Sequence, residues 1–286
     1  MRPRSLVIDL YANYIRYRGG VASVQTLVGL LDRFGVGEET ARVTLSRLKR
    51  QGWLATERRS RSSWYRLTPL GVQELDEGRE RIFTRHGMDP WDGRWSLVIY
   101  QVPEAERQVR QWLRTRLQWL GFGPLGPATW VSPHDRLREL EEAMAAAEIE
   151  AQVDLLDAST GSLARDRELA RRCWDLEEVA EAYQRFVTRY QPRIERYEAG
   201  EFEGAEALIE HIELVAAYRK FPFSDPDLPR ELLPTDWIGT TAHTTFLQGY
   251  ELLKGAAMAY YDEVADPAPA AVARVPLPGE GRSGLS

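Results

Sequence analysis

Residues 36–67 constrain the fold of this chain more than any other segment, because a short basic helix is followed there by a basic hairpin. The helix is predicted from about Glu38 to Gln51, and Gly52 is placed to end it in the left-handed conformation. Apolar residues at helical spacing form its docking face: Ala41, Leu45 and Leu48. Residues 53–58 and 62–67 then follow as two predicted strands. This layout is typical of a winged helix-turn-helix, which places one helix in the major groove of DNA.

The opposite face of the predicted helix carries six residues suited to DNA: Arg42, Val43, Ser46, Arg47, Lys49 and Arg50. Arg42 and Arg47 can each donate two hydrogen bonds to a guanine, and an exposed Val43 can contact a thymine methyl group. The other three fit phosphate contacts, which position a protein without specifying a sequence. Three arginines crowd the predicted turn of the hairpin: Arg58, Arg59 and Arg61. Each arginine alone also fits a solvated surface, but together they favour DNA.

Positive charge is concentrated at one end of the chain. Residues 1–86 hold 16 Lys and Arg against 9 Asp and Glu, a local net charge of +7, although the whole chain carries −6. The remaining residues therefore carry a net charge of −13. A positive field confined to one end is what phosphate neutralisation needs, so we expect the acidic remainder to perform another task.

Other features of the composition indicate a cytoplasmic protein that is not an enzyme. A single cysteine, Cys173, excludes an intramolecular disulfide and fits a small core residue in a reducing compartment. No apolar stretch is long enough to span a membrane, and Met1-Arg-Pro-Arg does not resemble a signal peptide. The sequence has no Walker loop, zinc-binding spacing or nucleophile elbow, and its four histidines are scattered. We therefore expect no catalytic residues, no metal site and no cofactor.

The chain is predicted to be an α+β protein with three domains and a tail. Residues 1–87 form the winged helix-turn-helix, and residues 88–160 follow the order βαββαβ of a ferredoxin-like sandwich. Such a sheet often pairs with a copy of itself, which makes it the expected platform of a homodimer. Residues 161–265 are predicted to be helical, over 163–190, 201–220 and 241–263. The last segment, 266–286, is rich in Pro, Ala and Gly and is predicted to be disordered.

Motifs spread over residues 2–262 resemble the PaaX-type repressors of phenylacetate catabolism. They are Arg2-Pro-Arg-Ser-Leu, Tyr17-Arg-Gly-Gly, Arg42-Val-Thr-Leu-Ser-Arg-Leu, Gly52-Trp-Leu, Trp91-Asp-Gly-Arg-Trp, Trp119-Leu-Gly-Phe-Gly-Pro-Leu and the particularly specific Phe221–Trp237 segment. The resemblance implies a bacterial homodimer that represses aromatic-acid degradation operons. It also implies release from double-stranded operator DNA, an inverted repeat, when an aryl-CoA thioester binds, typically phenylacetyl-CoA.

The same resemblance implies a central domain like that of Cas2 nucleases, whose first strand ends in a metal-binding aspartate. Here the corresponding residue is Gln101, which lacks the carboxylate that a divalent cation needs. This difference favours a dimer scaffold, while a Cas2-like metal-dependent nuclease remains the alternative enzyme. An interaction module that does not bind DNA is a further alternative, as is a relative that responds to another acyl-CoA or small ligand.

The effector site is predicted where two cations adjoin the specific segment. Arg219 and Lys220 could bind phosphate groups, and the neighbouring aromatic residues could receive an aryl group: Phe221, Phe223 and Trp237. Charged surface residues beside a packing loop are the simpler interpretation of each residue.

Overall fold

The computed structural model describes residues 1–59, 62–84 and 90–267. Contacts divide the described chain into two compact units. The first unit contains residues 1–83, 187–219 and the segment from 243 onward, and the second contains residues 84–186 and 220–242. The first unit is therefore assembled from three separate stretches of sequence, and the second is inserted between them.

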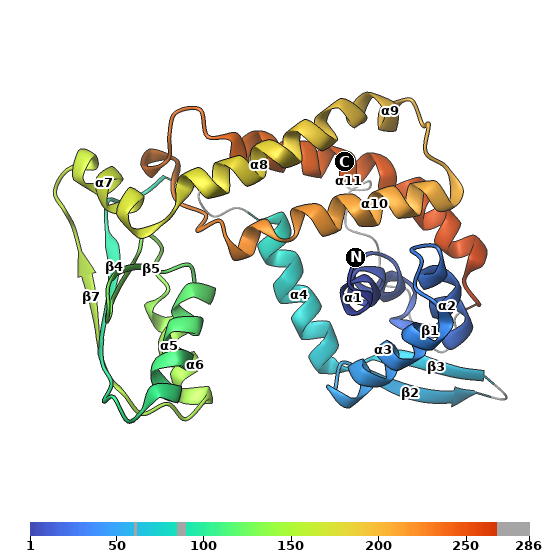
Figure 1. Ribbon diagram of the computed structural model, residues 1–286, viewed down its shortest axis with the longest axis horizontal. Coiled ribbons are helices and arrows are strands. Elements are labelled where there is room, and N and C mark those ends of the chain that lie inside the picture. Colours follow the sequence, from blue (N-terminus) through green and yellow to red (C-terminus); the bar gives the residue numbers. More distant parts are fainter. Residues whose placement is uncertain (60–61, 85–89, 268–286) are drawn as a thin grey trace, which may run out of the picture. The chain divides into compact units, whose positions relative to one another are not determined.

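The first unit opens with four helices and three short strands (Figure 1). In chain order they are α1 (Pro3–Asn13), the 3-10 turn η1 (Ile15–Arg18), β1 (Val21–Ser23), α2 (Val24–Asp32), α3 (Glu38–Arg50), β2 (Leu54–Arg59), β3 (Ser62–Leu67) and α4 (Pro69–Phe83). As predicted, α3 and the two strands of the hairpin are present. Strand β1 is too short to show a pattern in the sequence, and it pairs antiparallel with β3, giving the sheet order β1-β3-β2.

The C-terminal helices complete the core of this unit. After the turn η3 (Gln191–Arg193) come α9 (Ile194–Glu198), α10 (Gly204–Tyr218) and α11 (Ile238–Val264), of which α11 belongs to the first unit from residue 243. One buried cluster joins residues of α1, α2 and α3 to residues of α10 and α11, including Leu6, Leu208, Ile212 and Tyr261. This grouping differs from the division by sequence order, in which residues 161–265 form a domain of their own. Helical periodicity shows which face of a helix is apolar, but not which distant helix covers it.

Buried polar groups also link the two ends of the first unit. The Tyr14 hydroxyl lies 2.5 Å from Nδ1 of His211, which is 1% exposed. Burial, together with the nearby Lys254 ammonium, lowers the pKa of His211 from 6.5 to about 3. Asp9 on α1 is 2% exposed, and its Oδ1 lies 3.0 Å from Nε of Arg219. Burial raises the pKa of Asp9 from 3.8 to about 7, although the Arg219 guanidinium opposes this shift.

Two contacts hold the end of α11 against the start of the chain. Arg18 donates two hydrogen bonds of 2.6 Å to the carboxylate of Asp262. The backbone amide of Asp266 donates to the Thr26 hydroxyl at 2.9 Å, and the Ser23 hydroxyl donates to the Asp266 carboxylate. Ser23 also caps α2, because its side chain accepts a hydrogen bond from the Thr26 amide. The rest of the predicted tail, from residue 268, lies outside the described residues.

The second unit is built on an antiparallel sheet with two helices on one face. Its elements run β4 (Trp95–Gln101), α5 (Arg107–Trp119), β5 (Gly123–Gly126), β6 (Thr129–Ser132), α6 (Leu137–Ala146) and β7 (Gln152–Ala158). The strand order is β5-β6-β4-β7, and all neighbours are antiparallel. Figure 1 shows α5 and α6 side by side, and the buried residues between them and the sheet include Val98, Leu113 and Leu140.

The predicted helical segment 163–190 is divided into α7 (Leu163–Cys173) and α8 (Leu176–Tyr190). The break occurs at Trp174, which has extended backbone angles and whose ring stacks on Trp95 at 6.3 Å. A Cβ on Gly123 would lie 2.6 Å from the same ring, so the indole packs directly on the backbone of β5. Packing on the sheet thus interrupts a sequence that is otherwise helical.

Two glycines of α4 give opposite predictions for stability. A Cβ added at Gly71 would lie 2.6 Å from the backbone oxygen of Trp53, which has no rotatable bond that could move it away. We expect Gly71→Ala to lower the free energy of unfolding by about 1–3 kcal/mol, the usual cost of overpacking. At Gly78 nothing lies within 4 Å of the added atom, and Gly78→Ala should raise it by about 0.5–1 kcal/mol. Urea denaturation measures both changes; a Gly71→Ala protein as stable as the unmodified protein would contradict the predicted clash, and a destabilised Gly78→Ala protein would contradict the second prediction.

Among the described residues, no helix is both long and apolar enough to cross a membrane.

Candidate nucleic-acid interface

Helix α3 has one buried face and one exposed basic face. Its three apolar docking residues are at most 1% exposed: Ala41, Leu45 and Leu48. All six residues predicted to contact DNA are exposed: Arg42, Val43, Ser46, Arg47, Lys49 and Arg50. Val43 is 61% exposed, although a valine in a monomer gains nothing from contact with water. We define these six residues as the basic face of α3.

The end of α3 fixes where the hairpin begins. Gly52 has φ 79°, as predicted for a residue that ends a helix in the left-handed region. The amides of Gly52 and Trp53 donate to the carbonyls of Lys49 and Leu48, both at 3.0 Å. This pair of bonds is a Schellman motif, which satisfies the last helical carbonyls and directs the chain into β2. The guanidinium of Arg4 lies 5.8 Å from the Trp53 ring centre and covers this junction.

The hairpin presents further positive charge beside α3. Strands β2 and β3 pair from Leu54 opposite Leu67 to Arg59 opposite Ser62. Arg58 is exposed near the end of this ladder, as predicted. The side chain of Arg59 and all of Arg61 lie outside what the structure describes.

The cations of the basic face differ in their partners. Arg42 is bound to Glu38 one turn earlier, with a 2.7 Å separation between Nη2 and Oε1. Both side chains are largely exposed, and such surface pairs contribute only about 0.3–0.5 kcal/mol, so breaking this pair costs little. Arg47, Lys49 and Arg50 have no acidic partner among the residues the structure describes, and they lie in the last turn of α3. There the helix dipole favours their positive charge.

The predicted effector residues are divided between the two units. Arg219 follows α10 in the first unit and pairs with the buried Asp9, so it has a structural partner that the sequence did not reveal. Lys220 is exposed and belongs to the second unit. Phe221 is buried and stacks on Tyr183 with ring centres 4.1 Å apart. Trp237, also buried, meets the same tyrosine edge-on.

Phe223 differs from the other two predicted aromatic residues because its side chain is 65% exposed. Its ring lies 5.7 Å from that of Trp119 on α5. The Phe221–Trp237 segment therefore has a buried aromatic anchor and an exposed aromatic residue. It also contains the 3-10 turns η4 (Phe221–Phe223) and η5 (Arg230–Leu232).

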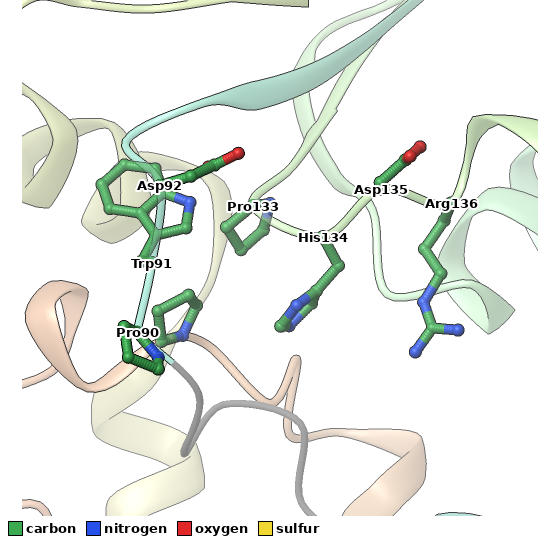
Figure 2. Close-up of a pocket in the computed structure, with 8 residues that line it drawn as sticks. Pro90, Trp91, Asp92, Pro133, His134, Asp135 and Arg136 are labelled. Carbon is green, nitrogen blue, oxygen red and sulfur yellow. The ribbon is translucent and has the colours of Figure 1, made fainter.

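One pocket of the second unit was not predicted from the sequence. It has a volume of about 400 Å³ and lies among the linker at Trp91, the loop that carries His134 and Arg136, and Pro229 (Figure 2). In the sequence, Trp91 stands out only as part of a family motif, and His134 is only one of four scattered histidines. The useful signal was the loop Pro133-His-Asp-Arg136, which places a ring and a cation directly before α6.

Groups suited to metal or thiol chemistry are sparse. Gln101 is exposed at the end of β4, opposite Gln152. Within the described residues, no three His, Cys, Asp or Glu side chains come together in a way that could hold a metal ion. Burial raises the pKa of the Cys173 thiol to about 11, against the nearby Arg172, so this side chain stays protonated at neutral pH.

Three family models match successive parts of the chain. They are described as PaaX-like protein for residues 2–71, PaaX protein central Cas2-like domain for residues 88–170, and PaaX-like protein C-terminal domain for residues 174–263. The chain belongs to the PaaX family of transcriptional repressors. It is 30% identical over 284 residues to the transcriptional repressor PaaX of Escherichia coli (strain K12), across 96% of this chain and 87% of that protein.

A solved structure has a similar fold. It is that of an uncharacterized protein, Rv0674, from Mycobacterium tuberculosis, with a TM-score of 0.62 and 23% identity. The similarity covers 91% of this chain and 97% of that one.

Proposed function

We propose that this protein is a DNA-binding repressor of an aromatic-acid catabolic operon, released from its operator by an aryl-CoA thioester such as phenylacetyl-CoA. The observation that carries the DNA-binding half of the proposal is the basic face of α3, which is exposed while the apolar face of the same helix is buried. Membership of a repressor family supports the same half. The effector half of the proposal follows from the family resemblance.

In this proposal α2, α3 and the β2–β3 hairpin act as a winged helix-turn-helix. The element order from α1 to β3 and the pairing of β1 with β3 support that arrangement. The basic face of α3 would enter the major groove, where Arg42, Arg47 and Val43 read base edges. Lys49, Arg50 and the hairpin arginines would bind the flanking phosphates.

The sheet of the second unit is proposed as the dimer platform. Its order β5-β6-β4-β7, with helices on one face, is compatible with a ferredoxin-like sandwich. On the face opposite the helices, Leu97 of β4 pairs with Leu156 of β7, which is 47% exposed. A second copy that covered this face would remove these leucines from water and bring two α3 helices to an inverted repeat. Half-sites would then lie about 34–36 Å apart, or multiples of that distance.

Release requires only that the thioester bind better to a dimer whose α3 helices are wrongly spaced. To reverse occupancy from 99:1 to 1:99, the ligand must prefer that form about 10⁴-fold. The segment Lys220–Trp237 is proposed as part of the effector region, because its buried aromatic anchor gives the exposed residues a fixed base.

Fluorescence anisotropy with the DNA upstream of this protein's own gene tests the proposal. We expect a Kd on the order of 10 nM that weakens steeply with added salt. Phenylacetyl-CoA should release the DNA, whereas free phenylacetate and CoA should not. Specific binding that ignores all three compounds would retain the repressor and reject this effector. The absence of specific binding would reject the repressor, and cleavage of the DNA on addition of Mg²⁺ would favour a Cas2-like nuclease instead.

A further inference from the structure

The pocket beside α6 is built from side chains that are already held in place. The indole nitrogen of Trp91 donates a hydrogen bond of 3.0 Å to the backbone oxygen of Arg94, and its ring meets Trp95 edge-on at 5.3 Å. Nε2 of His134 lies 2.8 Å from the backbone oxygen of Asp227, to which it donates. Both rings are therefore fixed before any ligand arrives, which lowers the entropic cost of binding.

Asp227 belongs to the Phe221–Trp237 segment, so this pocket adjoins the proposed effector region. Its φ of 51° is uncommon for a residue other than glycine. The Asp227 amide donates to the Asp225 carboxylate at 2.8 Å, and its carbonyl accepts from His134, so the turn is tied at both sides. The same segment supplies Pro229 to the pocket wall.

The pocket places apolar rings beside a cation, a histidine and two carboxylates, those of Asp92 and Asp135. Trp91 and Pro229 contribute apolar surface, as do Pro90 and Pro133. In Figure 2 the side chains of His134 and Arg136 point to the same side, whereas the carboxylate of Asp135 points the other way.

Arg136 has N–H groups that are available to donate hydrogen bonds to a ligand. Arg136 is 28% exposed and gives one hydrogen bond of 2.5 Å to Glu139. A guanidinium has five N–H donors in a planar fork, so this bond leaves others for a ligand oxyanion.

We propose that this pocket binds a planar ring that is linked to an anionic group, and that it is a ligand-binding subsite of the repressor. A ring fits the wall of tryptophan and prolines, because stacked contacts favour flat apolar surfaces. An anion fits Arg136, whose fork matches carboxylate and phosphate oxygens. The volume of about 400 Å³ suits a ring and its linker rather than an entire acyl-CoA. The inference rests on the proposed function, in which the effector is an aryl-CoA; that molecule offers such chemistry at its adenine nucleotide, whereas its acyl end carries an aryl ring on an uncharged thioester.

Isothermal titration calorimetry of the full-length protein with phenylacetyl-CoA, CoA and phenylacetate tests the pocket. The variant Arg136→Gln removes the cation, and we expect it to raise the Kd of the bound ligand about tenfold or more, as loss of a charge-assisted hydrogen bond does. Trp91→Leu removes the ring and should raise the Kd by about 2- to 10-fold. The matched control is Arg138→Gln on α6, two residues after Arg136, since Arg138 is 88% exposed, pairs with Glu142 and does not line the pocket. This control should bind like the unmodified protein.

The ligands distinguish the two sources of the ring. Equal weakening of CoA and phenylacetyl-CoA by Arg136→Gln would assign the pocket to the adenine nucleotide. Weakening of phenylacetyl-CoA without any change for CoA would place the uncharged acyl end there and overturn the anionic part of the proposal. Unmodified protein that binds none of the three overturns both the effector half of the proposed function and this pocket. Binding that both pocket variants leave unchanged overturns the pocket alone, provided that thermal unfolding shows the variants to be folded.

Discussion

Replacing Arg47 by alanine should weaken specific binding to operator DNA by about 10- to 100-fold, the loss of one bidentate contact to a guanine. Arg47 is exposed in the last turn of α3 and has no ion pair among the described residues, so its loss costs the folded protein little. Anisotropy titrations on operator DNA and on a scrambled duplex measure the effect. The loss should be confined to the operator, because a base contact carries sequence information.

Two further variants distinguish a sequence-specific base contact from a contact that depends on charge alone. Lys49→Ala should weaken binding to both duplexes alike and reduce the salt dependence of log Kd by about one unit, as expected for a phosphate contact. Arg185→Ala is the control: this arginine is 71% exposed on α8, pairs with Glu181 and lies outside the proposed interface. An Arg47→Ala protein that binds the operator as tightly as the Arg185→Ala protein would contradict the assignment of α3 as the reading helix.

Asp9 and His211 should make the stability of the first unit depend on pH in opposite directions. The pKa of Asp9 rises from 3.8 to about 7 on folding, so between these values only the unfolded chain is ionised at this position. Stability therefore falls as pH rises through this window, by up to about 4 kcal/mol. The pKa of His211 falls from 6.5 to about 3, so between these values only the unfolded chain is protonated there. Stability then rises with pH, by up to about 5 kcal/mol.

In the unmodified protein the effects of Asp9 and His211 on the pH dependence of stability offset each other. Single substitutions should reveal each effect separately. The Asp9→Asn protein keeps His211, so the urea concentration at which half of it is unfolded should be higher at pH 6.5 than at pH 4.5. His211→Asn keeps Asp9 and retains an oxygen near the Tyr14 hydroxyl, and its midpoint should fall over the same range. Circular dichroism at three pH values is sufficient for the comparison. Slopes of the same sign in both variants would show that these groups titrate normally in the folded protein.

The local features of the candidate interface could be predicted because they depend on short-range rules. The apolar spacing of Ala41, Leu45 and Leu48 determined which face of α3 is buried, and Gly52 marked the end of the helix. The exposure of the basic face follows from the same periodicity. The pairing of Arg42 with Glu38 could also have been predicted, since the two lie one helical turn apart.

Long-range packing could not be predicted in this way. Nothing near Asp9 in the sequence indicates that its partner is Arg219, and nothing near His211 indicates Tyr14. The break at Trp174 arises because a tryptophan finds Trp95 and Gly123 on a distant sheet, which outweighs local helix propensity. The pocket at His134 likewise needs three segments that meet only in the fold.

The shared core of the first unit has a consequence for synthesis of the protein. The apolar residues of α1, such as Leu6 and Leu10, leave the ribosome long before their partners on α10 and α11, including Ile212 and Tyr261, have been made. Domains usually fold as units during synthesis, and the first unit is complete only once its C-terminal helices have been made. A chain terminated before residue 204 therefore lacks α10 and α11, the helices that complete this core.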